Sequence, residues 1–184
     1  MSHHRIFFLQ PLDDGLRLHH APLLDLLKLW YARREADGLP SRRSLDMQAL
    51  KPFLPHVFIA ECETVPADRP AREYLRWRYR LIGTAIVEAC GRDATGKYID
   101  ELYRGAELGG VMAALSETRQ GGMPRSLHGN ARFAGRAGME LETLLLPIGM
   151  PAGQNAQVIG AAFFRYAEPA RPVRRLSRIF NFAA

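Results

Sequence analysis

The chain is poor in cysteine and lysine and has no long apolar run. Its 184 residues include two cysteines, Cys62 and Cys90, which are too few for a disulfide framework or a four-cysteine zinc site. The apolar runs are short, since Ile6–Leu9 spans four residues and the window 144–150 contains both proline and glycine. Neither run suits a secretory signal or a membrane-spanning helix. We therefore expect a cytoplasmic protein with no membrane span.

The remaining composition is that of a globular domain with a basic surface. Hydrophobic residues make up 47% of the chain and charged residues 24%, which is the usual balance for a folded protein. The length suits one domain. The formal net charge is +6, and only three of the 25 basic residues are lysine. Arginine matches planar anions and interfaces better than lysine does, so phosphates, nucleic acids and acidic proteins are the partners that this charge allows.

An amphipathic helix is predicted after an irregular N-terminal segment, residues 1–21. Pro22 suits the first helical position, and Gly38 with Pro40 ends the helix. Apolar side chains recur between these points at helical spacing, and they are Leu23, Leu26, Leu27, Trp30 and Tyr31. Such a stripe is buried in a folded protein. It packs either against the rest of its own chain or against the identical stripe of a second copy.

Strand and helix patterns follow one another along the rest of the chain. Alternation with period two predicts strands, and apolar spacing of three and four predicts helices. The predicted strands are 56–60, 74–82, 125–133, 139–148 and 158–166, and the predicted helices are 46–51, 85–89, 98–103 and 107–120. Strands grouped at both ends of a helical middle indicate an α+β fold. The last three strands are joined by short loops, so we expect them to be antiparallel.

This order and five motifs resemble the Per-Arnt-Sim (PAS) family, in particular the stand-alone PAS-like proteins typical of alphaproteobacteria. The motifs are Trp30, Leu39-Pro40-Ser41-Arg42, Leu54-Pro55-His56, Tyr79-Arg80-Leu81-Ile82-Gly83-Thr84 and Gly91-Arg92-Asp93-Ala94-Thr95-Gly96-Lys97. The resemblance covers a domain of residues 22–168. It implies a five-stranded antiparallel sheet with short helices on one face and an added N-terminal helix. Residues 169–184 then form a basic C-terminal tail.

The resemblance also implies how such a protein associates. PAS domains commonly pair through a helix that precedes their first strand, which favours a homodimer. The predicted dimer residues are Leu23, Leu26, Leu27 and Trp30. The alternative is that this helix folds over the outer face of its own sheet. The family supplies no catalytic residues, and we expect a regulatory protein partner.

No cofactor and no metal site is predicted. The segment Gly91–Lys97 nearly matches a phosphate-binding loop, but Tyr98 replaces the Ser or Thr that holds magnesium, and the segment follows a predicted helix. Ala94 stands where light-sensing PAS domains carry the cysteine that reacts with flavin. The predicted helix 107–120 lacks the histidine that haem-binding PAS domains use. Metal-ligand spacings such as HxxxH are absent.

An internal cavity between the sheet and the helices is the favoured site. Strand alternation and helical phase predict the side chains that face this cavity. The alternative is that the same side chains form a filled hydrophobic core. The candidates are Tyr79, Leu81, Ile86, Met112, Leu115, Leu141, Thr143 and Leu145. A small apolar ligand of unknown identity would find its polar contacts at Tyr79 and Thr143.

A basic face on the predicted strand 74–82 is the second candidate. Arg76, Arg78 and Arg80 share one side of this strand. They form either a site for an anion, nucleic acid or acidic partner, or a solvated face paired with Glu140 and Glu142. We favour the paired face.

We therefore predict a non-enzymatic sensory or regulatory module that acts through a protein partner. Two alternatives stay open. A small cone-shaped, isomerase-like enzyme would need a buried acidic residue or histidine in the cavity for proton transfer. A basic nucleic-acid-binding protein would need an element that enters a groove, and because no such motif is recognisable, nucleic acid is the less favoured partner.

Overall fold

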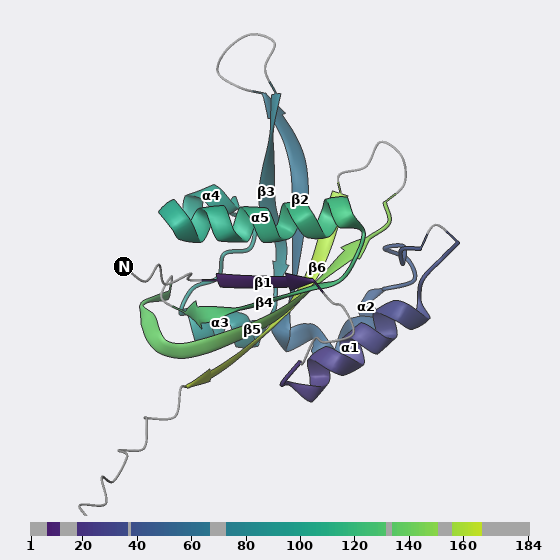
Figure 1. Cartoon of the computed structure of the whole chain (residues 1–184), viewed down its shortest axis with the longest axis horizontal. Coiled ribbons are helices and arrows are strands. Elements are labelled where there is room, and N and C mark those ends of the chain that lie inside the picture. Colours follow the sequence, from purple (N-terminus) through teal and green to yellow (C-terminus); the bar gives the residue numbers. More distant parts are fainter. Residues whose placement is uncertain are drawn as a thin grey trace, which may run out of the picture.

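A six-stranded antiparallel sheet forms the centre of the chain (Figure 1). The computed structural model describes residues 7–11, 18–36, 38–66, 73–131, 134–150 and 156–166. The strands are β1 (Phe7–Pro11), β2 (Val57–Pro66), β3 (Glu73–Ile82), β4 (Arg125–Ala131), β5 (Arg136–Ile148) and β6 (Ala156–Tyr166). Their order in the sheet is β1-β4-β5-β6-β2-β3. The C-terminal half of the chain therefore supplies the middle of the sheet.

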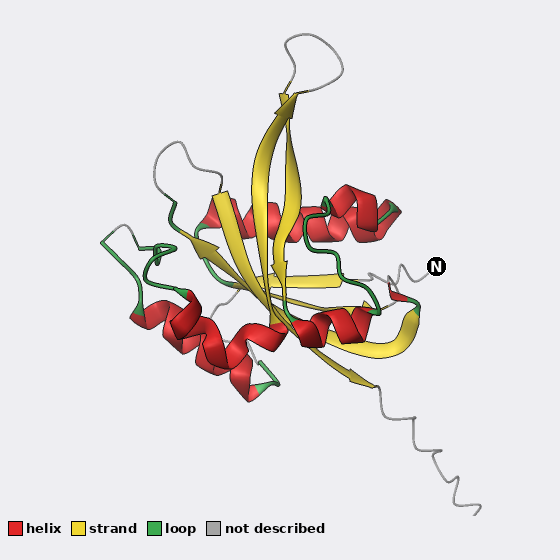
Figure 2. Cartoon of the chain, turned by 180° about the vertical axis from the view of Figure 1, so that it is seen from behind, coloured by secondary structure: helices red, strands yellow, loops and turns green. Residues whose placement is uncertain are grey.

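Helices cover both faces of this sheet. They are α1 (Ala21–Ala32), α2 (Met47–Leu50), the 3₁₀ helix η1 (Lys51–His56), α3 (Thr84–Cys90), α4 (Ile99–Leu102) and α5 (Gly105–Gly121). One apolar core joins the sheet to α3, α4 and α5, and we call this side the inner face. A second core joins the sheet to α1, α2 and η1 on the outer face. Helix α5 crosses in front of the strands in Figure 1 and behind them in Figure 2.

The predicted α+β architecture is confirmed, with one added strand. All five predicted strands are present, and β1 lies within the segment that was predicted to be irregular. It pairs with β4 from Phe7 opposite Gly129 to Pro11 opposite Arg125. The segment is too short to show a strand pattern, and its pairing depends on the free edge of β4. A proline is compatible with such an edge strand.

The strand β5 serves both cores because it is covered on both sides. Leu141 and Leu145 belong to the inner core, whereas Leu144, Leu146 and Ile148 belong to the outer core. Successive side chains of a strand point to opposite faces, so a strand buried on both faces reads as a nearly continuous apolar run.

The apolar stripe of α1 is buried in its own domain. Leu23, Leu26 and Trp30 are fully buried, and Leu27 is nearly so. The indole Nε1 of Trp30 donates a hydrogen bond to the carbonyl oxygen of Pro147 at 2.8 Å. The prediction that these four residues form a dimer interface is therefore wrong, because the outer face of the sheet already covers them. Homodimer formation stays a prediction, and other surfaces would have to carry it.

A β-bulge in β3 changes which face its last residues occupy. Ala60 pairs with Tyr79 and Ile59 pairs with Leu81, which leaves Arg80 as an extra residue. A bulge of this kind interrupts the strict alternation of a strand. Leu81 consequently packs against the outer core, and Ile82 packs against the inner core. The prediction that Leu81 faces the cavity is wrong for this reason.

Two of the family motifs meet at Gly83. A methyl group at this position would lie 2.2 Å from the carbonyl oxygen of Leu54 and 2.4 Å from that of Pro55. Only glycine allows this approach of the two backbones. The segment Gly91–Lys97 is likewise structural, because Gly96 donates its N–H to the Tyr79 carbonyl at 2.7 Å and Lys97 accepts from the Tyr79 N–H at 3.0 Å.

None of the helices within the described ranges is long and apolar enough to cross a membrane. The predicted basic tail, residues 169–184, lies outside the described residues.

Candidate functional site

An apolar cavity lies between the inner face of the sheet and helices α3, α4 and α5. Its volume is about 80 Å³. The lining is mostly aliphatic and aromatic and comprises Phe58, Tyr79, Ile82, Ile86, Cys90, Arg92, Ala94, Leu102, Tyr103, Val111, Ala114, Leu115, Leu127, Leu141, Thr143, Leu145, Ala162 and Phe164. Strands β2 to β6 and the three helices all contribute, so the cavity depends on the complete fold.

Six of the eight predicted cavity residues line it, namely Tyr79, Ile86, Leu115, Leu141, Thr143 and Leu145. Leu81 lies on the outer face. Met112 packs against the inner core but does not line the cavity, because α5 turns Val111 toward it instead. The prediction therefore fails at Leu81 through a bulge and at Met112 through a small error in helical phase.

Several lining residues were not predicted, although the strand patterns of the sequence contain them. Phe58 belongs to the predicted strand 56–60, and Ala162 and Phe164 follow the period-two alternation of β6. Tyr103 carries no such signal, because it follows the four-residue helix α4 and reaches the cavity through the tertiary fold.

The polar side chains of the cavity lining include Thr143 and two tyrosines. The Oη atoms of Tyr79 and Tyr103 lie 3.4 Å apart, and both side chains are buried. Burial raises the pKa of Tyr79 well above its usual value, and the neighbouring Tyr103 raises it further. Burial also raises the pKa of Tyr103. Both groups stay protonated near neutral pH and can donate a hydrogen bond to a ligand.

The cavity residue Cys90 is not set up as a nucleophile. Burial raises the pKa of its thiol, and the opposing effects of Arg92 and Arg136 are smaller. Burial likewise raises the pKa of Cys62. Reactive cysteines have lowered pKa values in electropositive surroundings, so both cysteines behave as small apolar side chains.

The cavity lacks the group that the isomerase-like alternative requires. Among the described residues that line it, none is aspartate, glutamate or histidine, and Arg92 is the one charged residue. Arg92 is itself exposed and donates to the Leu102 carbonyl at 3.4 Å. It therefore marks the side on which the cavity approaches the solvent.

The arginines of β3 form ion pairs, although with partners other than those predicted. Arg76 binds Asp100 through two nitrogens at 2.9 and 2.6 Å, and its guanidinium lies over the Tyr98 ring. Arg78 pairs with Glu63, and Arg80 lies within 4.0 Å of Glu61 and Glu63.

The prediction that Glu140 and Glu142 supply the partners of these arginines is wrong. Glu140 pairs with Arg165 of β6 at 2.6 Å. Glu142 pairs with His19 and His20. The pairing of the arginines with other carboxylates weakens the case for a nucleic-acid surface on β3.

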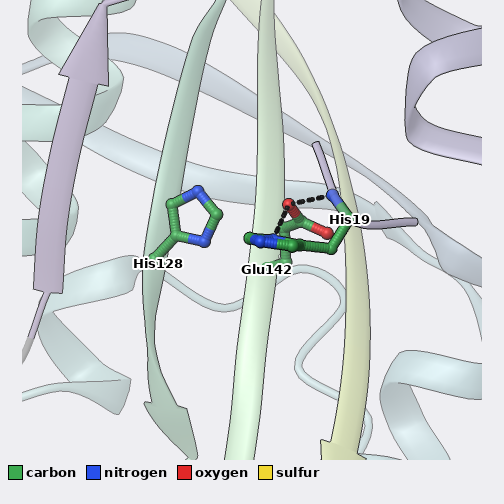
Figure 3. Close-up of side chains that lie close together, drawn as sticks. All are labelled: His19, His128 and Glu142. Atoms are coloured by element: carbon green, nitrogen blue, oxygen red, sulfur yellow. Dashed lines mark hydrogen bonds and ion pairs between the residues drawn. The ribbon is translucent and has the colours of Figure 1, made fainter. Parts of the chain in front are cut away.

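A polar cluster surrounds Glu142 on the outer face (Figure 3). Its carboxylate is almost completely buried. One oxygen accepts the N–H of His19 at 2.8 Å and lies 3.2 Å from His19 Nδ1. The other oxygen accepts the N–H of His20 at 3.1 Å and lies 2.5 Å from His20 Nδ1. Burial by itself would raise the pKa of Glu142, but these hydrogen bonds outweigh it and hold the pKa below its usual value.

His128 completes this cluster. It is the direct neighbour of Glu142 in the β4–β5 ladder, and its ring meets that of His19 edge to face with centroids 5.9 Å apart. Burial lowers the pKa of His128, an effect that Glu142 partly opposes. Nearby, His20 and His56 both stack on Phe163. The cluster was not predicted, because His19 is more than 100 residues from His128 and Glu142 along the chain and no local spacing links the three residues.

Comparison with known proteins identifies the family. A protein-family model described as "PAS domain" matches residues 18–163, which include α1 and all of the cavity lining except Phe164. The chain therefore belongs to the PAS domain family, as the sequence motifs predicted. No curated protein and no solved structure matches the chain.

Proposed function

We propose that this protein is a sensory or regulatory PAS module that binds a small apolar ligand in the cavity of its inner face. The observation that supports this function is the cavity itself, in which an apolar lining surrounds the Tyr79 and Tyr103 hydroxyls. Ligand pockets are typically apolar with a few placed polar groups. The family model supports the sensory or regulatory role, since PAS domains are generally non-enzymatic sensory modules.

The size of the cavity limits the ligand. A volume of about 80 Å³ is smaller than the roughly 300–1,000 Å³ of pockets for drug-sized molecules. Engineered apolar cavities of roughly 150 Å³ take up benzene or xenon. We therefore propose a ligand of only a few non-hydrogen atoms, carrying at most one or two polar atoms for the tyrosine hydroxyls.

We further propose that the module acts through contact with a regulatory protein. No acid–base pair lines the described cavity, so binding rather than chemistry is the event that a ligand can cause there. Leu24 and Tyr31 are exposed apolar residues on α1, and their spacing of seven residues puts them on one side of the helix. This side, which flanks the buried stripe, is our candidate surface for a partner or a second copy.

The cavity proposal is tested with xenon and benzene as probes on the full chain. Leu115→Trp fills the cavity and should abolish the chemical-shift changes that the probes cause in an NMR spectrum. Met112→Trp is the matched control, because it adds the same ring to the same helix at a residue that does not line the cavity. The control should keep the probe response.

Melting temperatures without probe complete this experiment. An open cavity accommodates the new ring, so Leu115→Trp should melt close to the parent protein. A core that is already filled would instead be overpacked and lose roughly 1–3 kcal/mol of stability. Unchanged probe binding in Leu115→Trp would contradict the proposed site.

A further inference from the structure

Three side chains with metal-ligating atoms converge on the outer face. His19 comes from the segment before α1, His128 from β4 and Glu142 from β5 (Figure 3). One ligand atom of each lies within 4.8 Å of the others. His19 Nδ1 and a Glu142 oxygen are 3.2 Å apart, and two ligands of one tetrahedral zinc, with bonds of 2.0–2.1 Å, lie about 3.3 Å apart.

We propose that His19, His128 and Glu142 bind a divalent transition-metal ion, with zinc as the best fit. Two imidazoles and one carboxylate are a ligand set that zinc takes when its fourth position is left to water. Hard ions such as Mg²⁺ prefer oxygen ligands and near-ideal octahedral geometry, so this nitrogen-rich set selects against them. The His19 side chain is 59% exposed, which leaves the fourth position on the solvent side.

The surroundings of Glu142 orient it for this role. His20 holds the second carboxylate oxygen through its N–H and its Nδ1 atom. The first oxygen lies beside His19. Hydrogen-bonded groups that orient the ligands are a general feature of metal sites. His20 is accordingly a positioning residue rather than a ligand.

The charges around the cluster also favour a cation. Glu142 is a buried carboxylate, and its ion-pair partners among the described residues are histidines only. A buried charge is costly unless an opposite charge compensates it.

A bound ion would fasten the start of α1 to the middle of the sheet. His19 lies two residues before the first residue of α1, and its two proposed co-ligands lie on neighbouring strands. An ion that binds only the folded chain stabilises it by mass action. Zinc should therefore raise the melting temperature of the protein.

The test uses the full chain after dialysis against EDTA. Zinc chloride is titrated by calorimetry, and Co²⁺ is added separately to look for the intense visible bands of a tetrahedral site. His19→Gln and His128→Gln should each weaken zinc binding at least tenfold, remove the zinc-dependent rise in melting temperature and remove the Co²⁺ bands. The matched control is His56→Gln, a histidine beside Phe163 but outside the ligand set, which should bind zinc like the parent.

Two controls keep the result interpretable. His19 is more than half exposed, so His19→Gln should melt like the parent without metal even if His128→Gln does not fold. The double variant His3→Ala/His4→Ala tests the N-terminal histidines, which lie outside the described residues. Loss of zinc binding in that double variant, or parental zinc affinity in His19→Gln, would overturn the proposal.

Discussion

The two faces of the sheet are packed in different ways. On the outer face, Leu144 and Leu146 are fully buried in the core beneath α1. On the inner face, Leu141 and Leu145 of the same strand line a cavity of about 80 Å³. The same strands thus support a closed core on one side and an open one on the other. The inner face, with its cavity, is the one that we propose as the ligand site.

The covering helices explain the difference. Helix α1 places three leucines and Trp30 against the outer face, and a hydrogen bond to the Pro147 carbonyl anchors the indole. Helix α5 is longer, but only Ala114, Leu115 and Thr118 among its residues are buried. Small side chains do not fill the space between a helix and a sheet, so a cavity remains there.

The largest effect should come from charges in the closed core. The double variant Leu23→Glu/Leu27→Glu places two carboxylates in the outer core, where Leu23 is fully buried. Burial of unpaired charges should cost at least about 5 kcal/mol in total, comparable to the whole stability of many domains. We expect circular dichroism to show an unfolded chain.

Leu24→Glu is the control on the same helix, because Leu24 is 44% exposed. It should change the free energy of unfolding by no more than about 0.5 kcal/mol. A double variant that stays folded and sediments as a monomer would contradict the packing of α1 and restore the dimer interpretation of its stripe.

A smaller effect should distinguish the two faces directly. Leu144→Ala on the outer face removes contacts from a filled core and should cost about 4 kcal/mol. Leu115→Ala on the inner face should cost about 2–3 kcal/mol, because its side chain already borders empty space and loses fewer contacts. Urea unfolding at neutral pH measures both values, and equal costs would show that the inner face is packed as tightly as the outer.

The smallest effect concerns the hydroxyl pair of the inner face and is seen at high pH. The pKa of Tyr79 is raised in the folded state, so above about pH 10 the unfolded chain releases the tyrosine proton while the folded chain keeps it. Stability from this group is fully present below about pH 10 and is lost as the pH rises further.

Tyr79→Phe should therefore flatten the decline of the urea midpoint above about pH 10. At neutral pH it should cost no more than about 1 kcal/mol, because the hydroxyl contact at 3.4 Å is long. Tyr74→Phe, at a residue 48% exposed, is the surface control and should leave the urea midpoint at neutral pH unchanged. An identical decline in Tyr79→Phe and the parent would argue against a buried, protonated hydroxyl.

Local patterns in the sequence predicted the elements well, but not always what covers them. The apolar stripe of α1 predicted that Leu23 and Trp30 would be buried. Spacing within one helix cannot show whether the surface that covers them is the sheet of the same chain or a second copy of the protein. The predicted strand 74–82 matched β3 almost residue for residue. Its bulge at Arg80 depends on the register with β2, which no pattern within β3 reveals.

The cavity could be predicted from local patterns in the sequence, whereas the histidine cluster could not. Most predicted cavity residues were correct because strand alternation directs Leu141, Thr143 and Leu145 to one side. The cluster of His19, His128 and Glu142 requires the pairing of β4 with β5 and the docking of the segment before α1. Such contacts arise from the tertiary fold and leave no trace in local spacing.

The alternation of β5 puts the two sites back to back. Leu141 and Thr143 line the cavity, while Glu142 between them holds the histidine cluster on the opposite face. One strand thus forms a common wall, and a displacement of its backbone at these residues moves both sites at once. If a ligand in the cavity changes the affinity of the histidine cluster for an ion, the ion must change the affinity for the ligand by the same factor.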